Sequence, residues 1–367
     1  MVKTKILNVI DHMELGGAQR IVTQLLEGWN CNGIELRSFS LRRSDYHILL
    51  HDGSLFISSN HKSRYNLLSF LELKNHIEKN NINILHLHLP KSVFFGVLVK
   101  ILYFENLRII VHEHGDIFQH KHFYNLILRL FQNKINLFLA VSQATKMELI
   151  ENAKIDGEKI NILYNFIDLN KFNLENFNKF DKTIERKKFG LNTSDYILGF
   201  AGRLDKLKGC DILIKSIPYV NIPNCKIVIA GDGVEKKELE KLVGDMDIKD
   251  RIIFMGYIKD MLRFYRLIDC LVIPSRSESF GLSAIEGQAS GVPVIASDIK
   301  GLNEVVLDKE TGLLFEKDNE KDLAGKIQLV NYDKNLRIKL ARNGMDNVRK
   351  YSLDNYLLNL ENIYNNA

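Results

Sequence analysis

Two carboxylates and the short loop between them are the residues best placed for chemistry. Glu278 and Glu286 stand eight positions apart, and the loop turns into a helical segment at Gly281. The first amides of a helix lack intrahelical partners and the helix dipole favours negative charge there, so this turn predicts a phosphate site. Glu286 lies about a turn and a half into the helix, where a carboxylate can accept hydrogen bonds from two sugar hydroxyls. The amides expected to face the phosphate are those of Ser279, Phe280, Gly281 and Leu282. Taken alone, the two glutamates could instead be a capping charge and a solvated helix position.

A second group of charged residues follows the strand-like run at 196–201. Gly202 ends that run, and Arg203 and Lys208 lie on the loop that enters the next helical segment. Arginine can grip two phosphate oxygens at once, whereas lysine supplies a compact point charge. The two cations favour an anionic ligand near the same phosphate site, although each could also be an ordinary surface charge.

Two glycines after the first strand-like run are a further candidate. Gly16 and Gly17 open a helical segment, and glycines at a helix start let the backbone approach a ligand closely. A plain strand-to-helix turn would have the same sequence. Neither this segment nor Ala230-Gly-Asp-Gly233 has the G-x-G-x-x-G spacing of a dinucleotide site, and the sequence contains no Walker A pattern.

Four histidines form two H-x-H patterns at the ends of strand-like runs, His86 with His88 and His112 with His114. Alternation along a strand places each pair on one face, so two pairs on neighbouring strands could ligate a metal. A metal hydrolase would leave the motifs of the second half unused, and we therefore expect no metal. One or two of these side chains are expected to make polar contacts in a cleft, with His114 the first candidate, and the sequence leaves open which of the four are functional.

The composition is that of a soluble globular protein, with 46% hydrophobic and 26% charged residues. A chain of 367 residues is longer than a single hydrophobic core usually supports, so two domains are expected. The net charge of +5 suits anionic ligands or an anionic membrane surface, and no basic tail predicts nucleic-acid binding. The four cysteines lack C-x-x-C pairing, and neither a signal-peptide core nor a membrane-spanning window is present, so a cytoplasmic location is expected.

Strand-like runs alternate with helix-like segments throughout, which predicts an α/β fold with parallel sheets and crossover helices. The Asn- and Lys-rich segment 168–180 indicates a linker, so we expect an N-terminal domain at 1–170 and a C-terminal domain at 171–350. Both are expected to be doubly wound and Rossmann-like and to face each other across a cleft, because ligands bind beyond the carboxyl ends of such strands. Strands are predicted at 4–10, 34–40, 83–88, 107–112, 137–141, 160–163, 196–201, 225–230, 251–254, 270–273, 293–296 and 312–315. Helices are predicted at 17–30, 66–80, 91–104, 121–133, 143–153, 208–219, 233–243, 260–267, 281–290, 319–331 and 335–350.

One helical segment, 120–134, mixes cations with large apolar residues. Such a helix could lie on an acidic membrane surface or could be a packing helix with an ordinary solvated face. Peripheral contact with the cytoplasmic face of the inner membrane is therefore one expectation.

Together these motifs resemble those of a family 4 retaining glycosyltransferase with the GT-B fold. The resemblance rests on G-R-L-x-x-x-K-G with Arg203 and Lys208, on the E-x7-E pattern of Glu278 and Glu286, and on the G-V-P-V segment after it. One departure is Gly287, which stands where the family usually has alanine and would weaken its helix slightly. Supporting pieces cover nearly the whole chain: Gly16-Gly17, His86-Leu-His88, His114-Gly115, Val141-Ser142, Gly231-Asp-Gly233, Gly256 and Gly301-Leu-Asn-Glu304.

The resemblance implies a UDP- or GDP-linked sugar donor, held mainly by the C-terminal domain, and no metal or other cofactor. Arg203 and Lys208 would neutralise the diphosphate together with the amides at 280–282. Glu286 would bind the ribose hydroxyls, and Glu278 would lie by the donor sugar.

The resemblance also implies contacts at the edges of the donor. Ile258, in the loop after the strand at 251–254, would face the base. Gly16 and Gly17 would close over the phosphates, and His114 would touch the donor sugar. A C-terminal helix at 351–367 would cross back to the first domain.

Transfer of the sugar builds negative charge on the leaving diphosphate, which fixed cations and helix amides stabilise. The resemblance implies retention by attack on the face from which the diphosphate leaves, a route that needs no second carboxylate nucleophile. The implied enzyme is a hexosyltransferase (EC 2.4) that acts on a glycan or lipid-linked glycan in bacterial capsule, O-antigen or lipopolysaccharide synthesis, with His114, Glu278, Arg203 and Lys208 as catalytic candidates. A sugar-nucleotide epimerase or hydrolase on the same fold, and a non-catalytic subunit, remain as alternatives.

Overall fold

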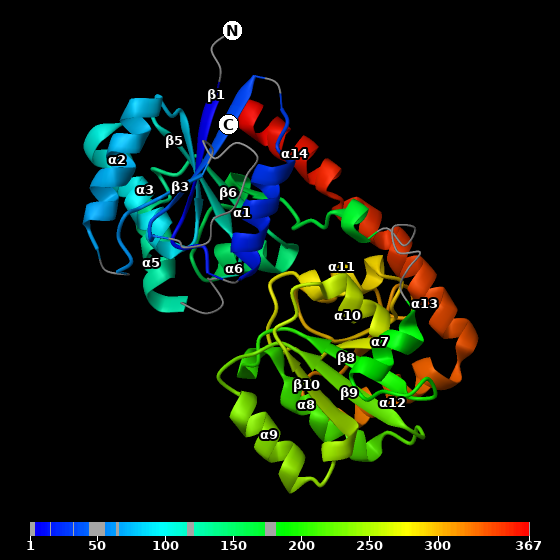
Figure 1. Ribbon diagram of the computed structural model, residues 1–367. Helices are drawn as coiled ribbons and strands as arrows, with labels where there is room; N and C mark the ends of the chain where they lie inside the picture. Colours follow the sequence, from blue (N-terminus) through cyan, green and yellow to red (C-terminus); the bar gives the residue numbers. More distant parts are fainter. Residues whose placement is uncertain are drawn as a thin grey trace. The chain divides into compact units, whose positions relative to one another are not determined.

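The computed structural model describes residues 4–14, 16–31, 33–43, 56–63, 66–115, 121–172 and 181–366. The chain forms two compact units (Figure 1). The N-terminal unit contains the residues up to Phe166 and the C-terminal segment from Leu353, and the C-terminal unit is Ile167–Ser352. Part of the predicted linker, 173–180, lies outside the described residues.

The N-terminal unit has a parallel β-sheet at its centre. Its described strands are β1 Thr4–Ile10, β2 Ile34–Ser40, β3 Phe56–Ser58, β4 Ile84–His88, β5 Arg108–Glu113, β6 Leu137–Ala140 and β7 Ile160–Ile162. They are arranged in the order β3-β2-β1-β4-β5-β6-β7. Strands β1 and β4 are therefore the neighbours at which the strand order reverses, and ligands bind beyond the carboxyl ends of strands at such a point.

Helices connect these strands, and the last helix of the chain also belongs to this unit. They are α1 Gly17–Gly28, α2 Leu68–Asn80, α3 Pro90–Tyr103, α5 Lys121–Phe131, α6 Gln143–Glu151, the 3₁₀ turn η1 Gly157–Lys159 and α14 Leu353–Asn366. The helix α14, red in Figure 1, packs with Tyr364 against Trp29 at the end of α1, the two ring centroids lying 5.7 Å apart.

The C-terminal unit repeats the same design. Its described strands are β8 Tyr196–Ala201, β9 Cys225–Ala230, β10 Ile252–Gly256, β11 Cys270–Ile273, β12 Val294–Ser297 and β13 Leu313–Phe315. They are arranged in the order β10-β9-β8-β11-β12-β13, so the strand order reverses between β8 and β11. The loops that follow these two strands carry the predicted cations and glutamates, respectively.

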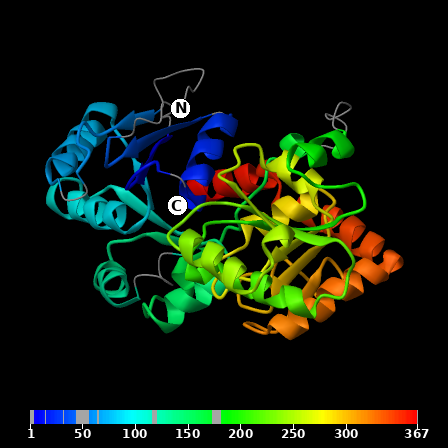
Figure 2. The same cartoon turned by 60° about the horizontal axis from the view of Figure 1, so that its bottom comes forward.

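The helices of this unit enclose one apolar core, which includes Leu198, Val272 and Ile327. Figure 2 shows the orange helices, α12 and α13, beside the sheet of this unit. The helices are α7 Lys182–Lys188, α8 Cys210–Ser216, α9 Lys236–Asp245, α10 Met261–Leu267, α11 Leu282–Ala289, α12 Glu320–Tyr332 and α13 Lys334–Asn347. The 3₁₀ turns are η2 Leu169–Phe172, η4 Lys206–Lys208, η5 Ile217–Tyr219, η6 Lys249–Arg251 and η7 Val348–Tyr351.

The prediction of two Rossmann-like parallel-sheet domains is confirmed. Among the described strands and α-helices, two were not predicted, the edge strand β3 and the helix α7, whose N-cap Asp181 accepts hydrogen bonds from the amides of Thr183 and Ile184. Both are short, so the apolar periodicity that reveals a longer element is weak in them. Among the described residues, no helix has both the length and the apolar character needed to cross a bilayer.

Candidate active site

The loop after β11 leads into α11 by way of Gly281, as the sequence predicts. Gly281 has a φ of 97°, a left-handed conformation that favours glycine, and a Cβ at this position would lie 2.7 Å from Leu302 Cδ2. Phe280 is buried, with its ring edge-on to Tyr351 at a centroid distance of 5.3 Å. Buried packing on one side and a glycine turn on the other thus fix where the first turn of α11 begins.

Lys208 and Glu278 form an ion pair between the two loops at the point where the strand order reverses. The distance from Lys208 Nζ to Glu278 Oε2 is 2.5 Å, and the side chains are 28% and 12% exposed. The structure therefore brings together two of the predicted catalytic residues, which are seventy positions apart in the sequence. Glu278 Cγ lies 4.0 Å from where a Cβ on Gly281, the N-cap of α11, would be, so the pair holds the Lys208 ammonium near that helix end.

The backbone around Lys208 is fixed by a cap and by a close approach. Asp205 accepts a hydrogen bond from the Lys208 amide at 3.0 Å, and Gly209 has a φ of 65°. A Cβ on Gly209 would lie 2.0 Å from the carbonyl oxygen of Pro274, which is backbone and cannot move aside. The glycine of the K-G pair is thus required because the loop after β8 touches the loop after β11.

Arg203 is placed differently from Lys208. Its side chain is 62% exposed, and its Nε donates to Asp205 Oδ2 within the same loop. An exposed arginine held by one short local contact remains accessible to an anion in solution, since such ion pairs are weak. Its predicted role at the diphosphate stays a prediction.

Glu286 is buried, with 4% of its surface exposed. Its Oε2 accepts a hydrogen bond from the Tyr265 hydroxyl of α10 at 2.8 Å. The carboxylate is therefore held in one orientation by a neighbouring helix. The predicted ribose contact stays a prediction.

Arg276 joins the same two loops and was not predicted. Its guanidinium donates to both carboxylate oxygens of Asp211, at 2.8 and 2.9 Å, and to Asp318 at 2.6 Å. It also donates to the carbonyl of Lys206 at 2.9 Å, and its amide donates to the carbonyl of Leu207 at 2.7 Å. These contacts hold the segment before Glu278 against the turn that carries Lys208. The available sequence signal was only a cation within the E-x7-E stretch.

The charges in this clamp shift each other's titration. Burial would raise the pKa of Asp211, but hydrogen bonds from Arg276 and Lys215 outweigh it and lower that pKa to about 2. The hydrogen bond to Asp211 in turn raises the pKa of Arg276. Both groups are therefore charged at neutral pH, and the clamp is ionic.

A close contact explains why glycine stands at position 287. A Cβ at this position would lie 2.6 Å from Leu271 Cδ2, on the strand β11 beneath the helix. The glycine lowers helix propensity in general, and here it also lets α11 pack closely on the sheet that carries Glu278's loop.

The remaining predicted residue of this unit, Ile258, is half-buried just after β10. Its position opposite the base stays a prediction.

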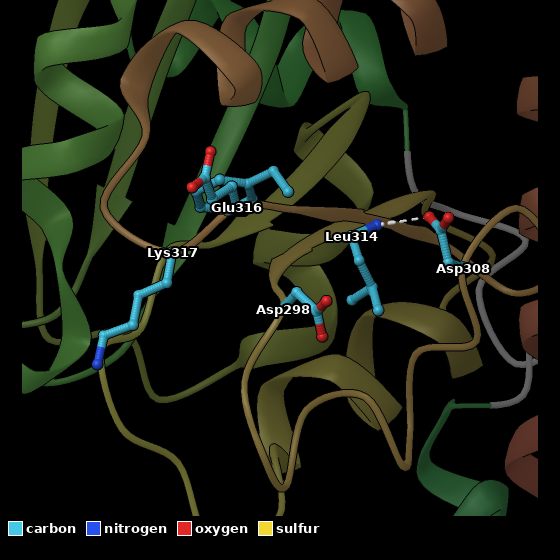
Figure 3. A pocket seen from close by; sticks show the side chains of 6 residues that line it. Asp298, Asp308, Leu314, Glu316 and Lys317 are labelled. Carbon is cyan, nitrogen blue, oxygen red and sulfur yellow. Dashed lines mark hydrogen bonds between the residues drawn. The ribbon is translucent and has the colours of Figure 1, made fainter.

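A separate open pocket lies at the ends of β12 and β13 (Figure 3). Asp308 there accepts a hydrogen bond from the Leu314 amide at 2.9 Å. Three of its six lining residues are acidic and none is a predicted donor residue, so it is a different site: Asp298, Asp308, Leu314, Phe315, Glu316 and Lys317.

In the N-terminal unit, Gly16 caps α1 and Gly17 is its first residue. The Gly16 backbone is extended, and its carbonyl accepts a hydrogen bond from the Arg20 amide at 3.1 Å. A Cβ on Gly16 would lie 2.3 Å from the side-chain oxygen of Gln19. The helix start after β1 is therefore as predicted, and its role at the phosphates is untested.

The four histidines lie together at the carboxyl ends of β4 and β5, which are neighbours in the sheet. His88 is opposite His112 in the strand register. His86 Nε2 lies 3.2 Å from His112 Nδ1, and His88 Nδ1 lies 2.9 Å from His114 Nε2. His86, His88 and His112 are buried, and their potential ligand atoms lie within 4.8 Å of one another, a spacing compatible with a metal. Two imidazole–imidazole hydrogen bonds already occupy nitrogens that a metal would need.

Burial makes the imidazolium form of these rings unfavourable. It lowers the pKa of His86, His88 and His112 well below the usual value, and neighbouring histidines add to the shift. It lowers the pKa of the half-buried His114 to about 3. The cluster is therefore neutral at physiological pH.

Two parallel-sheet α/β units of this kind are typical of the GT-B fold, and similar solved protein structures have the same design. A crystal structure of Anabaena Alr3699/HepE in complex with UDP and glucose superposes with a TM-score of 0.84 and 20% identity, covering 99% of this chain and 100% of that one. At this identity the likeness concerns the fold alone.

Family models match both halves of the chain. Residues 181–346 match glycosyl transferases group 1, and residues 15–171 match glycosyltransferase family 4. Each half of the chain is therefore similar to a glycosyltransferase family.

Two curated relatives give the range of similarity. The uncharacterized glycosyltransferase MJ1607 of Methanocaldococcus jannaschii is 30% identical over 230 residues, 62% of this chain and 59% of that protein. The capsular polysaccharide biosynthesis glycosyltransferase CapM of Staphylococcus aureus is 29% identical over 293 residues, 75% of this chain and 74% of that protein.

Proposed function

We propose that this glycosyltransferase moves a hexose, with retention of configuration, from a UDP- or GDP-linked donor to a glycan or lipid-linked glycan acceptor of a bacterial surface polysaccharide. The observation that carries the donor assignment is the Lys208–Glu278 pair beside the N-terminus of α11. The name of the CapM relative and the UDP and glucose in the HepE complex support the acceptor and donor classes.

The proposed roles follow from the chemistry of each group. Lys208, Arg203 and the amides at 280–282 stabilise the charge that develops on the leaving diphosphate. Glu286, already held by Tyr265, accepts hydrogen bonds from the ribose hydroxyls. Glu278 orients the donor sugar and keeps the Lys208 ammonium in place.

Gly16, Gly17 and His114 of the N-terminal unit, and Ile258 after β10, are also assigned to the donor. The glycines allow the chain near a phosphate, and His114 contacts the sugar. The acceptor oxygen attacks the anomeric carbon on the face that the diphosphate leaves, the C–O bond to the diphosphate breaks, and the diphosphate takes the acceptor proton. No metal is part of this route.

Thermal unfolding with a panel of UDP- and GDP-sugars tests the donor assignment, because a ligand that binds only the native state raises the unfolding temperature. The stabilising donor is then incubated with and without a glycan acceptor. Nucleotide release that requires the acceptor supports transfer, whereas equal release without acceptor indicates a hydrolase. An α-linked product from an α-linked donor supports retention, and a β-linked product contradicts it.

A peripheral membrane contact is the second part of the proposal. The helix α5 buries Tyr124, Ile127 and Leu128 and exposes an apolar stripe: Phe123 is 75%, Leu126 51% and Leu130 67% exposed. Arg129 and Lys134 are exposed beside this stripe, and such a basic amphipathic helix suits an anionic lipid surface.

Sedimentation with vesicles tests this contact. We expect the protein to pellet with phosphatidylglycerol vesicles and not with phosphatidylcholine vesicles, and F123S/L130S to abolish pelleting. The control is L329S, which removes an exposed leucine from α12 of the other unit. Unchanged pelleting of F123S/L130S would remove α5 from the proposal.

A further inference from the structure

Two cations lie where neighbouring strands of the N-terminal sheet end. Arg42 follows β2, and Lys91 is the second residue of α3, directly after β4. The strand β1 lies between β2 and β4 and pairs in parallel with both, so the loops after all three strands leave the carboxyl end of the sheet. This end includes the point between β1 and β4 at which the strand order reverses, where such sheets bind ligands.

The ammonium group of Lys91 is held by neutral groups. Its Nζ donates to the hydroxyl of the buried Ser69 at 3.3 Å and lies 4.8 Å from the centroid of the Phe95 ring. The Ser69 hydroxyl donates onward to the Asn66 carbonyl at 2.8 Å. These contacts fix the position of the ammonium group and leave its charge in place.

Asp11, the carboxylate that follows β1, is engaged by the backbone of α3. The N-cap of α3, Leu89, supplies no capping side chain. The two oxygens of Asp11 instead accept hydrogen bonds from the amides of Lys91 and Ser92, at 3.0 and 2.6 Å. Burial lowers the pKa of Lys91, Asp11 opposes that shift, and the charge of Arg42 adds to it. The two cations are therefore close enough to repel each other, and an anion bound to both would relieve that repulsion.

Arg42 has a weak and exposed partner. Its Nη1 donates to Glu14 Oε1 at 3.3 Å, and the two side chains are 21% and 71% exposed. An ion pair with so exposed a carboxylate contributes little to stability. Because this partner lies largely in solvent, an anion from solution can reach the same guanidinium group and replace it.

The backbone that presents Lys91 is strained. Leu89 has a φ of 78° and a ψ of 157°, a conformation that is rare for residues other than glycine. The hydroxyl of Ser92 contacts the carbonyl oxygens of His88 and Leu89 and so holds this turn. Strain of this kind concentrates at ligand-binding sites, which agrees with a ligand beside Lys91.

We propose that Arg42 and Lys91 form an anion site for the acceptor and that the acceptor carries a phosphate group. Two cations from different elements match the nearly two negative charges of a phosphate monoester, because arginine can grip two oxygens and lysine adds a point charge. The anion site stands on the contacts above. Its assignment to the acceptor rests on the proposed function, in which the donor diphosphate takes the cations of the C-terminal unit.

Binding is measured at Arg42 itself, by ¹H–¹⁵N spectra of the arginine Nε groups in the full chain, with Arg42→Gln identifying the signal. We expect inorganic phosphate to shift this signal to saturation and chloride at equal ionic strength to leave it unchanged. Acetate should bind more weakly than phosphate, and equally tight acetate binding would overturn the phosphate assignment. A signal that phosphate shifts no more than chloride does overturns the site.

Two substitutions should change phosphate binding in opposite directions. Lys91→Met removes the ammonium group and keeps the amide that contacts Asp11, so binding should weaken roughly tenfold, the loss of about one hydrogen bond to a charged group. Glu14→Gln removes the competing carboxylate and should tighten binding roughly threefold. Lys79→Met, at an exposed lysine of α2, is the matched control and should bind as wild type does.

Wild-type binding by Lys91→Met would remove Lys91 from the site. Unchanged or weaker binding by Glu14→Gln would show that Arg42 does not receive the phosphate. The second variant changes a largely exposed side chain, so it decides the question even if Lys91→Met does not fold.

Kinetics test the assignment to the acceptor. With the acceptor that supports nucleotide release, Lys91→Met should raise the acceptor KM roughly tenfold and leave the donor KM unchanged. A raised donor KM with an unchanged acceptor KM would overturn the assignment. Glucose 6-phosphate and farnesyl phosphate, tested as competitors of the acceptor, distinguish a phosphate on a glycan from one on a lipid, and inhibition by neither would also overturn it. Phosphate binding at Arg42 without nucleotide release for any acceptor would refute the proposed function, and the acceptor assignment with it, and leave the anion site intact.

Discussion

Lys208 Nζ lies 2.5 Å from Glu278 Oε2, and this pair joins the loop after β8 to the loop after β11. The two residues come from strands that are neighbours at the point where the order of the C-terminal sheet reverses. An anion bound at the start of α11 would therefore meet an ammonium group whose position is already set by a carboxylate. The pair thus positions the ammonium group before an anion binds.

Lys208→Ala should reduce turnover at least about a hundredfold, because one preorganised charge at a leaving group contributes on that scale. Steady-state release of the nucleotide measures the effect, with folding checked by circular dichroism. Lys241→Ala, an exposed lysine of α9, is the matched control and should behave as wild type. Turnover of Lys208→Ala within a few-fold of wild type would remove Lys208 from the diphosphate site.

Substitutions at Glu286 should separate ribose binding from packing. Glu286→Gln keeps an oxygen that can accept from Tyr265 but loses the charge, so we expect a near-normal unfolding temperature and a KM raised about tenfold or more. Tyr265→Phe removes the hydroxyl and keeps the carboxylate, and its KM should change less. If Tyr265→Phe impairs KM as much as Glu286→Gln, the carboxylate acts through packing instead.

Arg276→Ala should destabilise the C-terminal unit by about 2 kcal/mol, since it removes several hydrogen bonds to charged groups. Denaturant unfolding followed by circular dichroism measures this loss, with exposed Arg342 of α13 as the Ala control. The pKa of Asp211 is lowered to about 2 from 3.8. The unfolded state therefore binds the proton first, and this contribution is present above about pH 4 and is lost as the pH falls towards 2. Arg276→Ala should weaken that part of the acid sensitivity. If the stability of the variant and of the wild type depended on pH in the same way, the Arg276–Asp211 contact would not contribute to acid sensitivity.

The histidine cluster predicts acid sensitivity of the N-terminal unit at milder pH. The pKa of His114 is lowered to about 3 from 6.5, and burial lowers the pKa of His86, His88 and His112 in the same direction. The unfolded chain therefore takes up protons that the native unit does not, so stability is full above about pH 6.5 and falls as the pH drops below it.

Trp29 is the single tryptophan and lies in this unit, so its fluorescence reports the transition. Urea unfolding at pH 7.5, 6.5 and 5.5 should show a steep loss of stability in wild type and a shallower loss in His86→Phe, which removes one titrating group. A stability that is constant between pH 7.5 and 5.5 would mean that these rings are not held neutral.

Removal of metals should leave activity unchanged. His86, His88 and His112 have a spacing compatible with a metal, yet His86 already contacts Tyr364 and His112, and His88 Nδ1 already contacts His114. Turnover after EDTA treatment and desalting should equal that of untreated protein. A loss restored by zinc and abolished by His112→Ala would show instead that the cluster holds a functional ion.

Much of the fold follows from apolar periodicity, because long buried strands such as β1 and β9 leave unmistakable runs. The elements β3 and α7 were not predicted, because each is short and lies next to a polar segment. At the candidate site, glycines and charges were predictable one loop at a time. The Arg276 clamp and the pairing of Arg42 with Lys91 were not, since both depend on strand order and register, which bring distant residues together without leaving a local pattern.

The placement of α14 affects the order in which the protein is completed during synthesis. Tyr364 packs on Trp29 and contacts His86, so the core of the N-terminal unit lacks a component until the last helix has left the ribosome. Residues 167–352, which contain every element of the other unit, emerge earlier. The part of the chain that is translated first is therefore finished last.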